Sequence, residues 1–188
     1  MAYVRMSEAK AVGKAFSGSL QKRAGLILTE DSRGFSTGNS YDIFLSHSYG
    51  DGEIILGVKR LIEGLGLSVY VDWIEDPNLD HGKVTSRTAA ILRLRMRACS
   101  ALIYVHSSQS AKSVWMPWEI GFFDGFKPSH VWILPVVANS DSEFENQEYL
   151  GLYPTVEQLT SPRGQYLLAA RVGSDQLLLP TAVRRAGS

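Results

Sequence analysis

The stretch YDIFLSH, residues 41–47, is a short apolar run with few charges. Such a run predicts a strand that is buried on both faces of a sheet. Three further runs follow it at intervals, LSVYVDW at 67–73, ALIYVHS at 101–107 and VWILPVV at 131–137. Apolar positions at helical spacing in 54–65, and helical stretches at 85–99 and 115–126, separate them. Strands that alternate with helices predict a parallel sheet with helices on both faces.

The two ends of the chain differ from this central region. Residues 148–159, EYLGLYPTVEQL, predict a last short strand and turn, which would bring the sheet to five strands. Residues 7–30 predict one or two modest helices, and the glycine- and serine-rich residues 31–40 predict a linker. We therefore predict an N-terminal helical arm and linker at 1–40, a main domain at 41–160, and a C-terminal extension at 161–188 that packs on this domain.

Composition excludes several classes of partner. The chain has 188 residues, with 19 Lys plus Arg against 19 Asp plus Glu, so no net charge draws it to nucleic acid or to an anionic membrane. Its apolar runs are shorter than the roughly 20 residues that span a bilayer. The single cysteine, Cys99, and the absence of a signal-peptide pattern predict a cytoplasmic protein.

The sequence also predicts neither a metal nor a resident cofactor. The four histidines lack the paired spacing of a metal site, and no GxGxxG or GxxxxGK[ST] pattern is present. A dinucleotide would therefore bind as a substrate in an open crevice.

The position of a binding crevice follows from the fold. In a doubly wound sheet of flavodoxin-like order, ligands bind outside the carboxyl ends of the first and third strands. This rule selects residues after these two strands and in the helix that begins near residue 115, namely Ser46, His47, Ser48, His106, Ser107, Ser108 and Glu119.

Glu119 is the candidate catalytic residue. A carboxylate in the first turns of a helix is stabilised in its ionised form by the backbone dipole, by about 0.3 to 1 kcal/mol, so we expect an anion at neutral pH. An anion can stabilise the cation that forms when a nicotinamide glycosidic bond breaks, and the neutral leaving group needs no general acid. Without further context, a residue placed as Glu119 is more often a solvated first-turn residue than a catalyst, and Trp73, Trp115 and Trp118 could wall a ligand site or fill the core.

A family resemblance favours the catalytic interpretation. YDIFLSHSYGD resembles the first signature box of TIR (Toll/interleukin-1 receptor) domains, and SVYVDW with EDPNLDHGK resembles the second box and its BB loop. With ALIYVHSSQSAKSVWMPWE, the resemblance covers residues 41–153. Enzymatic TIR domains carry a tryptophan four residues before a catalytic glutamate, as Trp115 and Glu119 do here. The usual cysteine after that tryptophan is replaced by Met116, which Pro117 follows.

The resemblance implies a site and an activity. Ser46, His47, Trp73 and Trp115 would line an NAD+ crevice, and Ser113 would lie near the catalytic turn; Asp80 and Lys83 are further candidate loop contacts. Enzymatic TIR domains release nicotinamide from NAD+ and produce ADP-ribose, a cyclic isomer or a conjugate. A small TIR chain of this kind is similar to the signal-producing subunits of Thoeris-type antiphage defence, which self-associate and make a messenger for a separate effector.

Two other functions remain open on sequence grounds. A non-catalytic TIR module would use the same fold to bind another protein, with Glu119 a structural residue. A nucleoside deoxyribosyltransferase-like enzyme would use a similar sheet and a glutamate on another glycosidic substrate.

Overall fold

The structure is a computed structural model that describes residues 2–19, 40–72, 85–138, 148–172 and 174–186. Within these residues the main sheet has five parallel strands in the order β1-β5-β4-β2-β3. The strands are β1 (Val4–Arg5), β2 (Tyr41–Ser46), β3 (Val69–Tyr70), β4 (Cys99–His106) and β5 (Val131–Val137). The prediction of a five-stranded parallel, flavodoxin-like α/β fold is confirmed.

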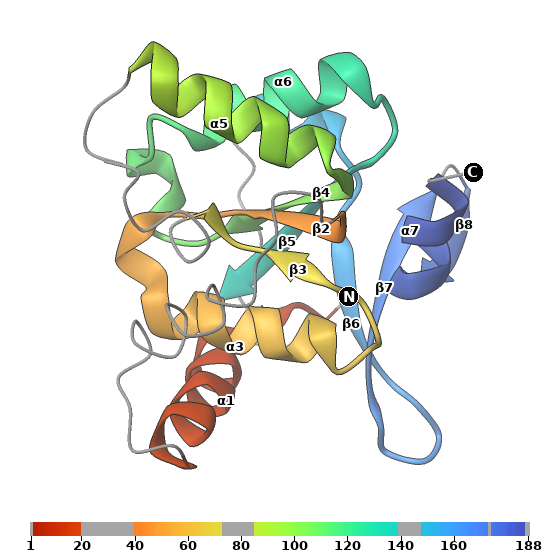
Figure 1. The fold of residues 1–188 in the computed structure, drawn as a ribbon. Coiled ribbons are helices and arrows are strands. Elements are labelled where there is room, and N and C mark those ends of the chain that lie inside the picture. Colours follow the sequence, from red (N-terminus) through yellow and green to blue (C-terminus); the bar gives the residue numbers. More distant parts are fainter. Residues whose placement is uncertain (1, 20–39, 73–84, 139–147, 173, 187–188) are drawn as a thin grey trace.

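Helices cover both faces of this sheet (Figure 1). Helices α1 (Met6–Ser19) and α3 (Gly52–Glu63) lie on one face, and α5 (Ser86–Arg97) and α6 (Met116–Phe126) lie on the other. Side chains alternate along β2 because successive residues of a strand point to opposite faces. Ile43 and Leu45 therefore pack with α3, whereas Phe44 packs in the cluster that contains α6. By the same alternation Ser46 points toward α6.

The fifth strand comes from an unexpected part of the chain. We predicted that it lies in residues 148–159, but the edge of β5 is occupied by β1, with Val4 opposite Val136. Thr155 makes only an isolated bridge to Ile133 on the same strand. The chain then turns into a second sheet instead of continuing along β5. The predicted N-terminal arm therefore contributes a strand to the sheet, which the helical pattern of residues 7–30 did not indicate.

The C-terminal part forms a small antiparallel sheet. Strands β6 (Val156–Thr160), β7 (Tyr166–Val172) and β8 (Asp175–Leu178) pair in that order, and α7 (Leu179–Ala186) follows. Leu179 and Ala182 of α7 are buried in the core cluster that also contains Leu45 and Trp132. The indole nitrogen of Trp132 donates to the Arg171 carbonyl oxygen at 3.1 Å. These residues pack on the main sheet, while the predicted domain boundaries at 40 and 160 stay predictions.

Helices α1 and α3 cross at very short range because two glycines lie at their contact. A Cβ atom on Gly57 would lie 1.9 Å from the Ala9 carbonyl oxygen, and one on Gly13 would lie 2.3 Å from the Glu53 carbonyl oxygen. No larger residue fits at either position without moving backbone. This contact anchors the predicted arm on the face opposite α6. In the described part of the chain, no helix combines the length and apolarity needed to cross a membrane.

Candidate active site

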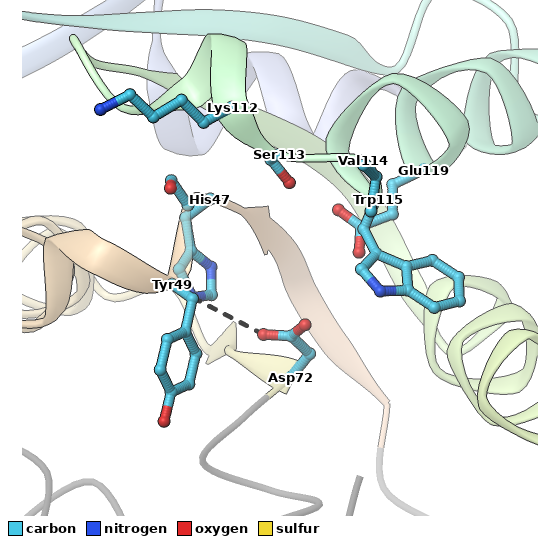
Figure 2. Close-up of a pocket in the computed structure, with 9 residues that line it drawn as sticks. His47, Tyr49, Asp72, Lys112, Ser113, Val114, Trp115 and Glu119 are labelled. Atoms are coloured by element: carbon cyan, nitrogen blue, oxygen red, sulfur yellow. Dashed lines mark ion pairs between the residues drawn. The ribbon is translucent and has the colours of Figure 1, made fainter. Parts of the chain in front are cut away.

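A pocket opens at the carboxyl ends of β2 and β4, where the order of the strands predicts it. It has a volume of about 190 Å³, and Figure 2 shows the side chains around it. The lining residues come from the turn after β2, from just beyond β3, and from the first turn of α6 with the segment that leads into it. They are His47, Ser48, Tyr49, Asp72, Lys112, Ser113, Val114, Trp115 and Glu119.

Glu119 lies in the first turn of α6 with its carboxyl group turned into the protein. The Ser113 hydroxyl oxygen accepts a hydrogen bond from the Met116 amide at 3.3 Å, which fixes the start of the helix. The Glu119 amide donates to the Trp115 carbonyl oxygen at 2.8 Å. Glu119 is only 2% exposed, and its Oε2 accepts a hydrogen bond from the Ser46 hydroxyl at 2.6 Å. Two segments 73 residues apart in sequence thus meet at this carboxyl group.

The charge state of Glu119 differs from our expectation. Burial and, to a smaller extent, the nearby Asp72 charge together raise the pKa of this carboxyl group to about 8, against the lowering effect of the Ser46 hydrogen bond. The expectation of an anion at neutral pH is therefore wrong, because a carboxyl group with this pKa is mostly protonated at pH 7. The helix terminus contributes about 0.3 to 1 kcal/mol, whereas burial of a carboxylate outweighs a contribution of that size.

His47 and Asp72 form a second polar pair in the pocket. The Nδ1 atom of His47 lies 2.8 Å from the Leu45 carbonyl oxygen, which fixes the orientation of the ring. Its Nε2 atom lies 3.6 Å from Asp72 Oδ1, as the dashed line in Figure 2 marks. The His47 and Asp72 side chains are 2% and 13% exposed.

A separate network joins the turns that follow β2 and β4. The Ser107 hydroxyl donates to Oδ2 of the buried Asp51 and accepts a hydrogen bond from the Gln109 amide. The Ser110 hydroxyl donates to the Ser107 carbonyl oxygen at 2.7 Å. These contacts hold the 48–51 turn, which carries Ser48 and Tyr49 of the pocket lining, against the 107–110 turn.

Comparison with known proteins agrees with this geometry. The chain is 50% identical over 152 residues to the "Probable 3' cyclic ADP-D-ribose synthase ThsB'" of Bacillus cereus (strain MSX-D12), covering 80% of this chain and 78% of that protein. It is 30% identical over 83 residues to the "Putative cyclic ADP-D-ribose synthase TIR2" of Cytobacillus dafuensis, covering 44% of this chain and 22% of that protein. No protein-family model matches the chain. This chain is a bacterial TIR-domain protein of the Thoeris type.

The TIR fold brings most of the predicted site residues together. His47, Ser113, Trp115 and Glu119 line one pocket, and Ser46 reaches it through its hydrogen bond to Glu119. Ser48, selected by the strand-end rule, lines the same pocket. Trp73 and the loop candidates Asp80 and Lys83 lie outside the described residues.

The candidates after β4 do not reach this pocket. Ser107 bonds to Asp51, and Ser108 lines a different cavity beside the start of α3. His106 is half-buried, and burial lowers the pKa of its imidazole. The strand-end rule selects the correct edge of the sheet, but the pocket lies on the side of that edge facing α6 and β3. The rule does not distinguish the two sides.

The tryptophans of the TIR motif have different surroundings. Trp115 is 9% exposed and forms one wall of the pocket. It packs edge-on against Trp118 with 5.5 Å between ring centroids. Trp118 is half-buried and stacks on Phe122, with the Arg93 guanidinium 5.4 Å from its ring centroid. Trp115 can therefore contact a ligand, whereas Trp118 supports the α5–α6 layer.

Sequence reasoning missed three features of the pocket. Asp72 lies two residues beyond β3, which ends at the same edge, whereas the sequence predicted that the strand continues to residue 73. Tyr49 and Val114 form an exposed apolar rim, being 72% and 69% exposed. Lys112 lies at the rim, with its amine donating to Gln109 at 2.9 Å. Nothing in the sequence distinguished these rim residues from ordinary surface residues.

Proposed function

We propose that this TIR-domain protein cleaves the bond between nicotinamide and ribose in NAD+ and makes a cyclic ADP-ribose. The observation that carries the proposal is the buried carboxyl group of Glu119, on α6 at the carboxyl end of β2, with a hydroxyl donor on one side and open pocket on the other. The names of the two relatives as cyclic ADP-D-ribose synthases support the same activity.

The arrangement suits a dissociative reaction at the ribose carbon. Nicotinamide leaves with the electron pair of the carbon–nitrogen bond and becomes neutral, so no residue has to protonate it. The ribosyl carbon then carries positive charge, which the ionised Glu119 stabilises. Ser46 holds that carboxylate in place through its 2.6 Å hydrogen bond, and a preorganised anion in a water-poor pocket is worth more than one in solvent.

Capture of the cation decides the product. For a product of the 3' cyclic type, a hydroxyl group of the same substrate molecule forms the new carbon–oxygen bond and loses one proton. The substrate must then fold back on itself while water is kept away from the ribosyl carbon. We propose that the Trp115 wall and the apolar rim of Tyr49 and Val114 exclude water from this step.

The exposed rim also supports the proposed assembly. Large apolar side chains at the mouth of a pocket favour coverage by another surface, and we propose that a second copy of the chain provides it. We further propose that the protein acts in the cytoplasm and that its product is a messenger for a separate effector protein. None of the predicted roles requires nucleic acid or a membrane.

Product analysis tests the proposal. NAD+ is incubated at high protein concentration with a crowding agent, and products of the wild type and of Glu119→Gln are separated by mass-resolved chromatography. Asp124→Asn is the matched control, because Asp124 is another carboxylate of α6 whose partner is the Tyr153 hydroxyl at 3.3 Å. We expect nicotinamide and a cyclic ADP-ribose from the wild type and the control, and neither from Glu119→Gln. Unchanged NAD+ under assembling conditions would instead favour a non-catalytic TIR module.

A further inference from the structure

Asp72 places a second carboxyl group beside Glu119. The two residues line the same pocket from opposite sides, Asp72 from the end of β3 and Glu119 from α6. In the view of Figure 2, both carboxyl groups lie between the side chains of His47 and Trp115. The Asp72 side chain is 13% exposed and Glu119 is 2% exposed. Two largely buried carboxyl groups therefore face the same pocket.

Among the residues that the structure describes, the other groups that face Glu119 do not supply a fixed positive charge. From β2 it meets the neutral hydroxyl of Ser46, and His47 is oriented toward Asp72. From β4 the nearest titratable group is the buried phenol of Tyr104, whose pKa burial raises. The Lys112 amine donates to Gln109 at the rim. The described surroundings of Glu119 thus favour its neutral form.

Two carboxylates that face one pocket repel each other, so the Asp72 charge helps Glu119 to retain its proton. A flat ring with a permanent positive charge could take the place of that proton, because it compensates both carboxylates at once. A neutral ring of the same shape could not. The pocket therefore distinguishes ligands by charge as well as by shape.

We propose that Asp72 is a specificity-determining residue, which with Glu119 makes the pocket accept a permanently cationic pyridinium ring in exchange for one proton. This inference rests on the proposed function, since NAD+ carries such a ring and its reduced form does not. When the ring enters, Glu119 releases its proton to solvent and becomes the anion that the reaction requires. The substrate thus creates the charge state that catalysis requires.

The proton balance also accounts for product release. Bond cleavage makes nicotinamide neutral, so the compensation that held the ring is lost. The hydroxyl that captures the ribosyl carbon gives up one proton, and Glu119 takes it. One proton is released to solvent per turnover, at binding, and the pocket returns to its initial state. Once Glu119 is protonated again, no charge in the ring holds the neutral nicotinamide in the pocket.

The test uses two small probes that cannot react. The cation 1-methylnicotinamide and neutral nicotinamide have nearly the same ring, and neither carries a glycosidic bond. Their affinities are measured by calorimetry from pH 6 to pH 9, in buffers with different ionisation enthalpies to count released protons. For the wild type we expect the affinity for the cation to increase about tenfold for each pH unit as pH rises toward the Glu119 pKa of about 8. Close to one proton is released per cation bound in this range. Nicotinamide shows no such increase.

Variants assign the effect to the two carboxyl groups. Asp72→Asn moves the rise in cation affinity to lower pH, weakens cation binding at pH 9, and moves the acid limb of kcat/KM for NAD+ in the same direction. Glu119→Gln abolishes the pH dependence. Asp124→Asn leaves the pH dependence of cation binding and that of kcat/KM for NAD+ unchanged. Because the wild-type profile needs no variant, it remains decisive even if Asp72→Asn folds poorly.

The outcomes separate this inference from the proposed function. If the wild type cleaves NAD+ but binds both probes with affinities independent of pH, or if Asp72→Asn keeps the wild-type profile, the role of Asp72 is overturned and the enzyme remains. If pH-dependent cation binding is found without NAD+ cleavage, the charge selection stands and the proposed reaction is overturned. Failure of both rings to bind counts against the inference.

Discussion

Helices α3 and α6 lie on opposite faces of the sheet, and each has a buried carboxyl group at its start, Asp51 for α3 and Glu119 for α6. The two carboxyl groups have different roles. Each carboxyl group accepts a hydrogen bond from a serine at the end of the other strand, Ser107 for Asp51 and Ser46 for Glu119. The two strands at the switch point are therefore tied together twice.

The surroundings of the two carboxyl groups explain the difference. The Asp51–Ser107 contact is continued by the hydrogen bonds of Gln109 and Ser110, so it fixes a turn. Glu119 faces an open pocket and a second carboxyl group. A serine–carboxyl pair is thus structural where further hydrogen bonds enclose it, and available for chemistry where a pocket and a like charge adjoin it.

The largest expected effect is on activity, and it separates the two carboxyl groups. Glu119→Gln removes the charge that stabilises the ribosyl cation, so we expect NAD+ cleavage to fall by about 10³-fold. Asp51→Asn keeps an oxygen that can accept from Ser107, so we expect most of the activity to remain while stability falls by about 1 to 2 kcal/mol. Initial rates of nicotinamide release, with denaturant unfolding of each variant, measure both. Equal losses of activity would show that the two pairs do not differ in function.

The next effect is on the pH dependence of stability. Folding raises the Glu119 pKa from its ordinary 4.5 to about 8, so between these values the folded state binds more protons than the unfolded state. Stability therefore decreases as pH rises from about 4.5 to 8, on the order of 3 kcal/mol by pH 7 from this group alone.

Unfolding by urea at pH 5, 6, 7 and 8 measures this decrease. Glu119→Gln is expected to remove most of it, because the amide cannot titrate, and Asp51→Asn is expected to retain it. A Glu119→Gln variant that loses stability with pH as the wild type does would contradict the assigned protonation.

The sequence predicted the main sheet because its central strands are long, apolar and regularly spaced. It also predicted the site edge, since the carboxyl ends of β2 and β4 follow directly from strand order. It could not predict β1, because two residues, Val4 and Arg5, carry no periodic pattern. Pairing of β1 with β5 depends on tertiary contacts that no local signal records.

The protonation state of Glu119 could not be predicted from the sequence, because it also depends on tertiary contacts. The position of this residue in a helix predicts a favourable interaction with the helix dipole, and that interaction alone gives an anion. Burial and the approach of Asp72, 47 positions away in the chain, reverse the result. Both effects arise only when α6 packs against the ends of β2 and β3.

The smallest effect concerns the glycines of the same two helices. Gly57 of α3 has backbone of α1 where a Cβ would lie, whereas Gly121 of α6 has open space. We expect Gly57→Ala to cost about 2 kcal/mol through forced separation of the helices, and Gly121→Ala to stabilise by about 0.5 to 1 kcal/mol through reduced freedom of the unfolded chain. Thermal unfolding of the two variants measures the contrast. Equal responses would mean that α1 is not held on α3 by close contact at Gly57, and that the two helices differ only at their first turns.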